Sequence, residues 1–266
     1  MDVLDRERIL AGLETRAIGR VLHVHDEVTS TNDVAMALAD AGAPHGTAVA
    51  AERQTRGRGR LGRAWSSPPG VGLWTSVVLR PPVPAAAVPV LTLAAGLAAA
   101  EAIEAEAGIP AALKWPNDVL LDGRKVAGTL LELRTEDQAV AHVVAGVGIN
   151  VHQARGDFPP EVAQTAVSIR QATGRPVSRV LLLRGLFTRL ETWYERFLAE
   201  GPDPVVTAAA GRMPVLGQPV VAVAGAERLE GTAARLDSDG ALVLALPGGG
   251  TRRVLAAEVT LAANDR

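Results

Sequence analysis

The chain has 266 residues, with 27 Lys and Arg against 29 Asp and Glu, so its net charge is −2, and it contains no cysteine. This length suits one large or two modest domains, and the near-neutral charge argues against a protein that mainly coats nucleic acid. The absence of cysteine excludes disulfides, a thiolate nucleophile and Cys-ligated metal sites. The charged N-terminus, from Met1 to Arg8, lacks the layout of a signal peptide, so we expect a cytoplasmic protein.

The basic residues are divided very unevenly between the two types. Arginine accounts for 25 of the 27, and the two lysines, Lys114 and Lys125, lie 11 positions apart. The planar guanidinium of arginine binds anions through two parallel hydrogen bonds, whereas lysine carries a compact ammonium on a flexible alkyl chain. A general replacement of lysine by arginine would explain the count but not the closeness of the two lysines, so this segment is a candidate site.

The first hundred residues are predicted to mix helices and strands. Apolar periodicity and turn residues predict helices over 6–14, 30–41 and 88–107, and strands from residue 22 and over 47–52 and 72–79. Ser30 or Thr31 is expected to cap the second helix, and Gly108 to end the third. The uncharged stretch 83–100 approaches the length of a membrane span, but it is rich in alanine and runs into Glu101, so we expect a buried helix instead.

The remaining chain is predicted to form a sheet, a helical segment and a second small sheet. Strands are expected over 112–115, 119–121, 126–133 and 139–146, with Asp122-Gly123 turning the middle pair. Two or three helices follow between 159 and 210, including an amphipathic one over 179–200. Short strands around 220–223, 229–236, 241–246 and 252–261 then favour a small antiparallel barrel. We therefore predict an α+β protein, with a mixed-sheet domain and packed helices over 1–212 and a small β-barrel domain over 213–266.

A loop rich in arginine and glycine follows the strand predicted over 47–52. Residues 54–65 read Gln-Thr-Arg-Gly-Arg-Gly-Arg-Leu-Gly-Arg-Ala-Trp. Glycines let the backbone approach a ligand and form an anion-binding nest, and arginines donate in pairs to carboxylate or phosphate. The loop therefore suits a phosphorylated or carboxylated small molecule, although it matches neither the P-loop nor the Rossmann phosphate turn. An Arg/Gly tract for RNA and a solvated flexible loop are the alternatives.

The predicted hairpin that contains both lysines is the second candidate. Residues 114–119, Lys-Trp-Pro-Asn-Asp-Val, present an amide and a carboxylate beside an indole. Lys125 lies early in the partner strand and faces opposite to Val126, so a pocket on that side would place its ammonium between two anionic reactants. A solvated surface lysine is the alternative. Glycines within 146–151 permit close backbone approach to a ligand, and a plain turn explains them equally well.

These segments, in this order, resemble the biotin protein ligase family, also called biotin–acetyl-CoA-carboxylase ligases. The matching segments are Ser30-Thr31-Asn32 and those at 57–65, 114–119, 124–132 and 146–151. The resemblance spans most of 20–155 and implies a class II synthetase-like catalytic domain with an SH3-like barrel after it. It also implies a reaction: biotin and ATP give biotinyl-5′-AMP and pyrophosphate, and the biotinyl group then passes to a lysine of the biotin carboxyl carrier domain of acyl-CoA carboxylases.

The resemblance implies a role for each matching residue. The biotin side would be lined by Ser30, Thr31, Asn32 and Gln54. The adenylate phosphate and the biotin carboxylate would be covered by Gly57, Arg58, Gly59 and Arg60, with Arg63 on the ATP phosphates. The rest of the binding set would be Trp65, Asn117, Lys125, Gly128, Gly148 and Asn150. Catalysis would rest on Lys125 and Arg58 as cations and on Asp118, which would accept a proton from the carrier lysine; an ordinary Asx turn is the alternative for Asp118.

Several further expectations follow from the same resemblance. Trp115 would pack beside adenine or biotin or belong to the core, and Glu258 would lie on the nucleotide side. Mg²⁺ is expected with ATP, although no metal-ligand spacing is present. Some family members carry an N-terminal winged helix that binds an operator, but Ser30 begins the matching segment here, so we expect the shorter form without repressor function.

The alternatives to a biotin ligase are a lipoate or octanoate ligase or transferase on the same scaffold, and a module that holds biotinyl-adenylate without transferring it. The Arg/Gly loop together with the Lys-Trp-Pro-Asn-Asp segment favours biotin. The expected partners are biotin, ATP and a carrier domain, without nucleic acid or membrane. The expected assembly is a monomer or a ligand-dependent homodimer.

Overall fold

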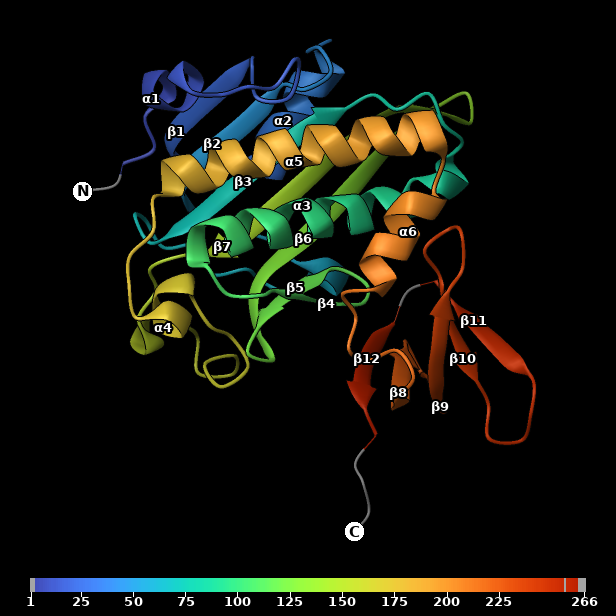
Figure 1. Cartoon of the computed structure of the whole chain (residues 1–266). Helices are drawn as coiled ribbons and strands as arrows, with labels where there is room; N and C mark the ends of the chain where they lie inside the picture. The colour runs from blue at the N-terminus through green and yellow to red at the C-terminus, as the bar shows by residue number, and fades with distance from the viewer. Residues whose placement is uncertain (1–2, 256, 263–266) are drawn as a thin grey trace.

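The computed structural model describes residues 3–255 and 257–262 and contains two sheets (Figure 1). The larger sheet has seven strands in the order β1-β2-β3-β7-β6-β5-β4. Its strands are β1 (Leu22–Val28), β2 (Ala48–Gln54), β3 (Gly72–Leu79), β4 (Ala112–Lys114), β5 (Asp118–Leu121), β6 (Arg124–Glu136) and β7 (Ala139–Asn150). The β1–β2 pair is parallel and the other pairs are antiparallel, so the predicted mixed sheet is confirmed.

Helices cover both faces of this sheet. They are α1 (Arg6–Ala11), α2 (Thr31–Asp40), α3 (Pro89–Ala107), α4 (Ile169–Thr173), α5 (Arg179–Glu200) and α6 (Asp203–Ala210). In Figure 1, α3 and α5 run side by side across the front of the sheet, and α2 lies behind it. Ala35 and Ala39 of α2 pack on the strands from that rear face. Because both faces are covered, every residue of β3 is buried, which is why its sequence lacks a polar alternation.

The helix α3 is the main core helix. With the short turn before it, the stretch Ala85–Ala107 is long and apolar enough to cross a membrane by length and composition, but 72% of its apolar window is buried inside the protein. It packs between the sheet and α5, so protein already covers its apolar surface. The prediction of a buried helix that ends at Gly108 is confirmed, since Gly108 adopts the left-handed conformation expected of a helix C-cap.

Several predicted boundaries were wrong. The first helix ends at Ala11 instead of residue 14, because the chain leaves the helix at Gly12. Ser30 occupies the N-cap position of α2, but its side chain makes no capping hydrogen bond among the described residues. The strands β6 and β7 extend well beyond the predicted limits and form a long hairpin whose register shifts between Arg134 and Thr135.

The C-terminal sheet has five antiparallel strands in the order β11-β10-β9-β8-β12. They are β8 (Pro219–Ala224), β9 (Glu227–Leu236), β10 (Leu242–Ala245), β11 (Thr251–Val254) and β12 (Glu258–Leu261). The single strand predicted over 252–261 is two strands at opposite edges of the sheet, because the chain crosses over between them. Within the described residues β11 and β12 do not pair, so hydrogen bonds do not close the sheet into a barrel.

The C-terminal sheet is seated on the larger domain near the lysine-bearing hairpin. The indole Nε1 of Trp115 donates to the carbonyl oxygen of Gly240 at 2.9 Å, and the indole is buried. Gly240 has φ +82 and packs against Leu93 of α3. Trp115 therefore belongs to the core and to this domain contact. The boundary between residues 212 and 213 stays a prediction.

Candidate active site

The hairpin of β4, β5 and β6 brings the two lysines and an acidic residue to one side of the sheet. Lys114 pairs with Asp118 in the β4–β5 register, and Lys125 Nζ lies 2.5 Å from Asp118 Oδ1. Asn117 is fixed in the turn, because its Nδ2 donates to the carbonyl of Thr129 at 2.8 Å and its own carbonyl accepts from the Thr129 N–H at 2.9 Å. The sequence placed these polar groups correctly on one hairpin.

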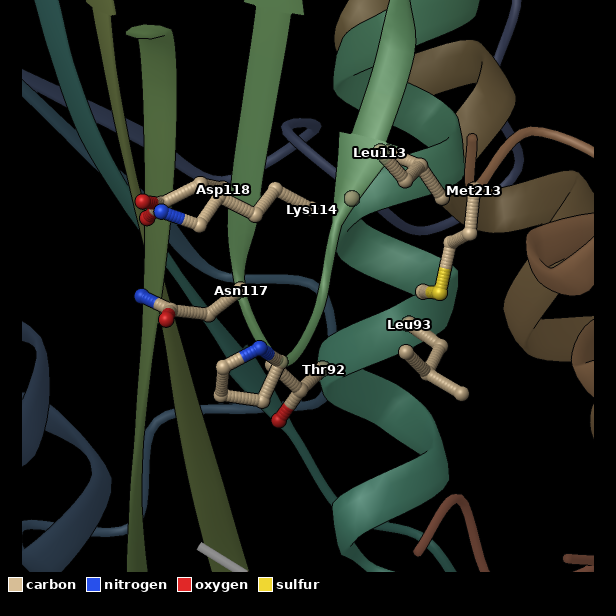
Figure 2. A pocket seen from close by; sticks show the side chains of 9 residues that line it. Thr92, Leu93, Leu113, Lys114, Asn117, Asp118 and Met213 are labelled. Atoms are coloured by element: carbon tan, nitrogen blue, oxygen red, sulfur yellow. The ribbon is translucent and has the colours of Figure 1, made fainter. Parts of the chain in front are cut away.

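Figure 2 shows how this hairpin separates polar from apolar side chains. Lys114, Asn117 and Asp118 point to one side, whereas Leu113 points toward α3 and Met213 on the other. The cavity on the apolar side has a volume of about 10 Å³, which is room for roughly one water molecule. It is lined by residues of the hairpin together with Leu93 and Met213, and it is too small to hold a substrate.

The Arg/Gly loop folds back on itself as a small hairpin. Arg58 and Ala64 form an isolated antiparallel bridge, and the Gly59 N–H donates to the Arg63 carbonyl at 2.7 Å. Gly57 has to be glycine, because a Cβ there would collide with the carbonyl oxygen of Trp65. The loop therefore carries its arginines on a defined backbone, at the mouth of the polar side of the hairpin.

The arginines of the loop differ in what holds them. Arg58 is braced by two carboxylates, with Nη1 2.7 Å from Asp33 Oδ1 and Nη2 3.1 Å from Glu132 Oε1. Burial opposes its charge, but these carboxylates outweigh burial and raise the pKa of Arg58. Arg60 has no carboxylate within ion-pair distance among the described residues, and its Nη1 lies 3.3 Å from Asn117 Oδ1. Burial accordingly lowers the pKa of Arg60, with partial compensation by Asp118. Arg60 is thus the loop cation best placed to receive an anionic ligand.

The C-terminal sheet reaches this site through Glu258. Arg63 Nη2 lies 2.5 Å from Glu258 Oε2, and both side chains are about half exposed. The hydrogen bond from Arg63 lowers the pKa of Glu258, and the charges of Lys114 and Lys125 contribute in the same direction. The same pairing raises the pKa of Arg63. The loop, the hairpin and β12 therefore converge on one electrostatic site.

Two facing glycines form a flat floor under Trp65. Gly128 and Gly148 are directly paired between β6 and β7. A Cβ on Gly148 would lie 2.8 Å from the Trp65 indole, and one on Gly128 would lie 3.1 Å from Lys125 Cε. Lys125 Nζ is 5.2 Å from the centroid of the Trp65 ring. The indole Nε1 is buried against this floor and has no hydrogen-bond partner among the described residues.

A buried hydrogen-bond network lies beside this floor. Gln54 Oε1 accepts from the backbone N–H of Thr31 at 2.8 Å, and Ser76 Oγ lies 2.8 Å from Thr31 Oγ1 and 2.6 Å from Asn32 Oδ1. Asn32 Nδ2 donates to Glu132 Oε2 at 2.6 Å. Predicted residues of α2 and β2 are thus joined to two residues, Ser76 and Glu132, that were not predicted. The available signal was weak, because Ser76 follows another polar residue in the mostly apolar β3, and Glu132 is one of several charged residues in β6.

Two other predicted site residues, Asn150 and Ser30, are buried within the protein. Asn150 is buried, and its Nδ2 donates to the carbonyl oxygens of Lys125 at 3.4 Å and Val167 at 3.2 Å. It therefore holds the Lys125 backbone from behind. Ser30 is buried next to Thr31 at the start of α2.

Comparisons with known proteins agree with this geometry. Residues 24–150 match the Biotin/lipoate A/B protein ligase family, and residues 215–261 match the Biotin protein ligase C terminal domain. A biotin–[acetyl-CoA-carboxylase] ligase of Paracoccus denitrificans is 38% identical over 86% of this chain and 96% of its own, and one of Mycobacterium tuberculosis is 34% identical over 96% and 98%. The Bacillus subtilis bifunctional ligase/repressor BirA is 41% identical, but the alignment covers 76% of this chain and 62% of BirA.

Among solved structures, the biotin protein ligase from Aquifex aeolicus in complex with biotin and ATP has a TM-score of 0.79 at 30% identity, over 91% of this chain and 100% of that chain. The fold is therefore that of the biotin/lipoate protein ligases. The chain belongs to the biotin protein ligase family, as its two near-full-length relatives and its C-terminal domain show.

Proposed function

We propose that this chain activates biotin with ATP as biotinyl-5′-AMP and then transfers the biotinyl group to a lysine of a biotin carboxyl carrier domain of acyl-CoA carboxylases. The observation that carries the proposal is the convergence of Lys125 and Arg60 on the Asn117–Asp118 turn, above the floor of Gly128 and Gly148. The similar Aquifex aeolicus ligase binds biotin and ATP, which supports the choice of these two substrates.

The first step joins two anions, so it needs positive charge. A biotin carboxylate oxygen attacks the α-phosphorus, a new P–O bond forms, the bond to the β-phosphate bridge breaks, and pyrophosphate leaves. The Lys125 ammonium and the Arg60 guanidinium would offset the charge on the α-phosphate, with Arg63 on the departing phosphates. Arg58 would act mainly by holding the loop, because Asp33 and Glu132 already occupy its guanidinium.

In the second step the carrier lysine attacks the acyl carbon, AMP leaves, and the amine loses a proton. We propose Asp118 as the proton acceptor. Its carboxylate holds the Lys125 ammonium at 2.5 Å, so it has the reach and charge to hold a second primary amine once Lys125 turns toward the phosphate.

The described residues contain no group of three or more His, Asp or Glu side chains that could hold a metal ion. Mg²⁺ usually binds through one or two carboxylates together with substrate phosphates, so it enters the proposal as part of the substrate MgATP. The two relatives matched over nearly their full length are named as ligases alone, so repressor activity is not part of the proposal.

The test is an assay with purified chain, MgATP, biotin and an isolated carrier domain. Pyrophosphate release without carrier reports the first step, and a mass increase of one biotinyl group on the carrier reports the second. Labelling by lipoate or octanoate in place of biotin would overturn the assignment of the substrate. Pyrophosphate release with no carrier labelling would overturn the transfer step.

A further inference from the structure

Glu132 contacts both halves of the site. Its carboxylate accepts from Asn32 Nδ2 at 2.6 Å and from Arg58 Nη2 at 3.1 Å. Asn32 is buried in the network beside the glycine floor, whereas Arg58 belongs to the Arg/Gly loop. Asp33 also pairs with Arg58, but the structure gives it no contact with Asn32. Glu132 thus joins the Arg58 guanidinium of the loop to the Asn32 end of the buried network, whereas Gln54 is at the other end and is held by Ser67.

The direction of each hydrogen bond in this network is fixed at both ends. Carboxylate and carbonyl oxygens only accept, so Asn32 has to present Nδ2 to Glu132 and to the carbonyl of Leu130, which leaves Oδ1 facing Ser76. At the other end a backbone N–H only donates, so Gln54 has to present Oε1 to Thr31. The amide orientations therefore follow from groups of unambiguous character.

Between these two ends the network has one hydrogen-bond donor too few. Three close oxygen–oxygen contacts have to be bridged: Asn32 Oδ1 to Ser76 Oγ at 2.6 Å, Ser76 Oγ to Thr31 Oγ1 at 2.8 Å, and Thr31 Oγ1 to Gln54 Oε1 at 3.0 Å. The two hydroxyls supply only two protons, and neither amide oxygen supplies any. If Asn32 were turned over, its Nδ2 would donate to Ser76 and all three contacts would be satisfied without a ligand. The Glu132 carboxylate at 2.6 Å opposes that turn most directly, and the Leu130 carbonyl at 3.3 Å opposes it as well, since both accept from Nδ2.

We infer that Glu132 is a positioning residue that keeps the substrate pocket short of one donor and so prepares it for a ligand with an N–H group, such as the cyclic urea of biotin. The inference rests on the proposed function for the identity of the substrate. A urea N–H supplies the missing donor to Thr31 Oγ1 or Gln54 Oε1, whereas the hydrocarbon and disulfide parts of lipoate or octanoate supply none. Through Arg58, the same carboxylate ties this pocket to the loop that covers the phosphates.

A matched pair of variants tests the role of Glu132. Glu132→Gln and Asp33→Asn each remove one carboxylate from Arg58, but only the former removes the nearer of the two acceptors that fix the orientation of the Asn32 amide. We expect Glu132→Gln to raise KM for biotin in pyrophosphate release about tenfold, the upper end of the scale for one hydrogen bond between neutral groups. Asp33→Asn is expected to leave that KM unchanged, whatever its effect on kcat through Arg58. Equal changes of KM in both variants would overturn the inference.

The second readout is the preference for biotin over an analogue with methylated urea nitrogens. We expect the preference to fall in Glu132→Gln and to persist in Asp33→Asn; its persistence in Glu132→Gln would refute the proton count. Ser76→Ala tests the same donor count without changing a contact of Arg58. In this variant the Thr31 hydroxyl supplies the proton for the one remaining contact, to Gln54 Oε1, so no donor is missing. Ser76→Ala should therefore also lose the preference for biotin over the methylated analogue. Wild-type protein that releases no pyrophosphate with biotin would instead refute the proposed function.

Discussion

Replacing Lys125 with alanine removes the ammonium that we place between the biotin carboxylate and the α-phosphate. Two opposite charges 4 Å apart interact by about 4 kcal/mol at the effective dielectric constant near a protein surface. The Lys125 side chain is 32% exposed, so solvent screening reduces its electrostatic stabilisation of the reacting anions to about 2–3 kcal/mol. That range corresponds to a loss of about 30- to 150-fold in the rate of adenylation.

The assay is pyrophosphate release at saturating MgATP and biotin, with the melting temperature as a check on folding. Lys114→Ala is the matched control, since Lys114 is the other lysine of the chain and is paired in the sheet register with Asp118, the residue that Lys125 contacts. Lys125→Arg retains the charge but has to fit where Gly128 already leaves little room beside Lys125 Cε, so we expect partial activity. A folded Lys125→Ala protein with a rate within about threefold of wild type would refute the electrostatic reasoning.

Four other predictions follow from the structure. Gly148→Ala places a Cβ 2.8 Å from the Trp65 indole and should lower activity at least tenfold, while Gly156→Ala, which meets no atom within 4 Å, should not; equal activities would exclude the glycine floor. Glu258→Gln frees Arg63 for the phosphates and should lower KM for ATP severalfold, with less than about 1 kcal/mol change in stability because the pair is exposed; a raised KM would contradict this. Burial opposes the charge of Glu191, but hydrogen bonds from the N–H groups of residues 16–18 lower its pKa. The contribution of Glu191 to the free energy of unfolding is therefore present above the ordinary pKa of about 4.3 and is lost as the pH falls below it. In urea titrations, Glu191→Gln should make the free energy of unfolding depend less on pH in this acid range, and an unchanged dependence would refute the assignment. Hydrogen exchange over residues 56–64 should slow when biotin and ATP bind, since an Arg/Gly loop loses backbone freedom over an anion, and equal protection in both states would count against it.

Local patterns were sufficient for the elements around the site. The bounds of β3 were predicted correctly because turn residues flank a mostly apolar run, and the turn at Asp122-Gly123 was predicted from its residue types alone. The last part of the chain was predicted as one strand, because β11 and β12 are separated by a short apolar stretch with no turn residue. Which edge of a sheet each strand joins depends on tertiary packing, which local patterns do not contain.

The same distinction applies to the site residues. Lys125 and Asp118 share one hairpin, so their spacing in the sequence places them together. Ser76 and Glu132 meet Asn32 across 44 and 100 residues of chain, and Arg63 meets Glu258 across 195. Such contacts arise only from the order of strands in the sheet and from the seating of the C-terminal sheet. The hydrogen-bond network and the role of Glu132 therefore became visible only in the folded structure.

The most direct test of the central claim is mass spectrometry of an isolated carrier domain after incubation with the purified chain, MgATP and biotin. The account predicts the addition of one biotinyl group to a single carrier lysine, dependent on ATP and strongly reduced by Lys125→Ala. A carrier that stays unmodified by biotin, or that is modified by lipoate or octanoate instead, would contradict it.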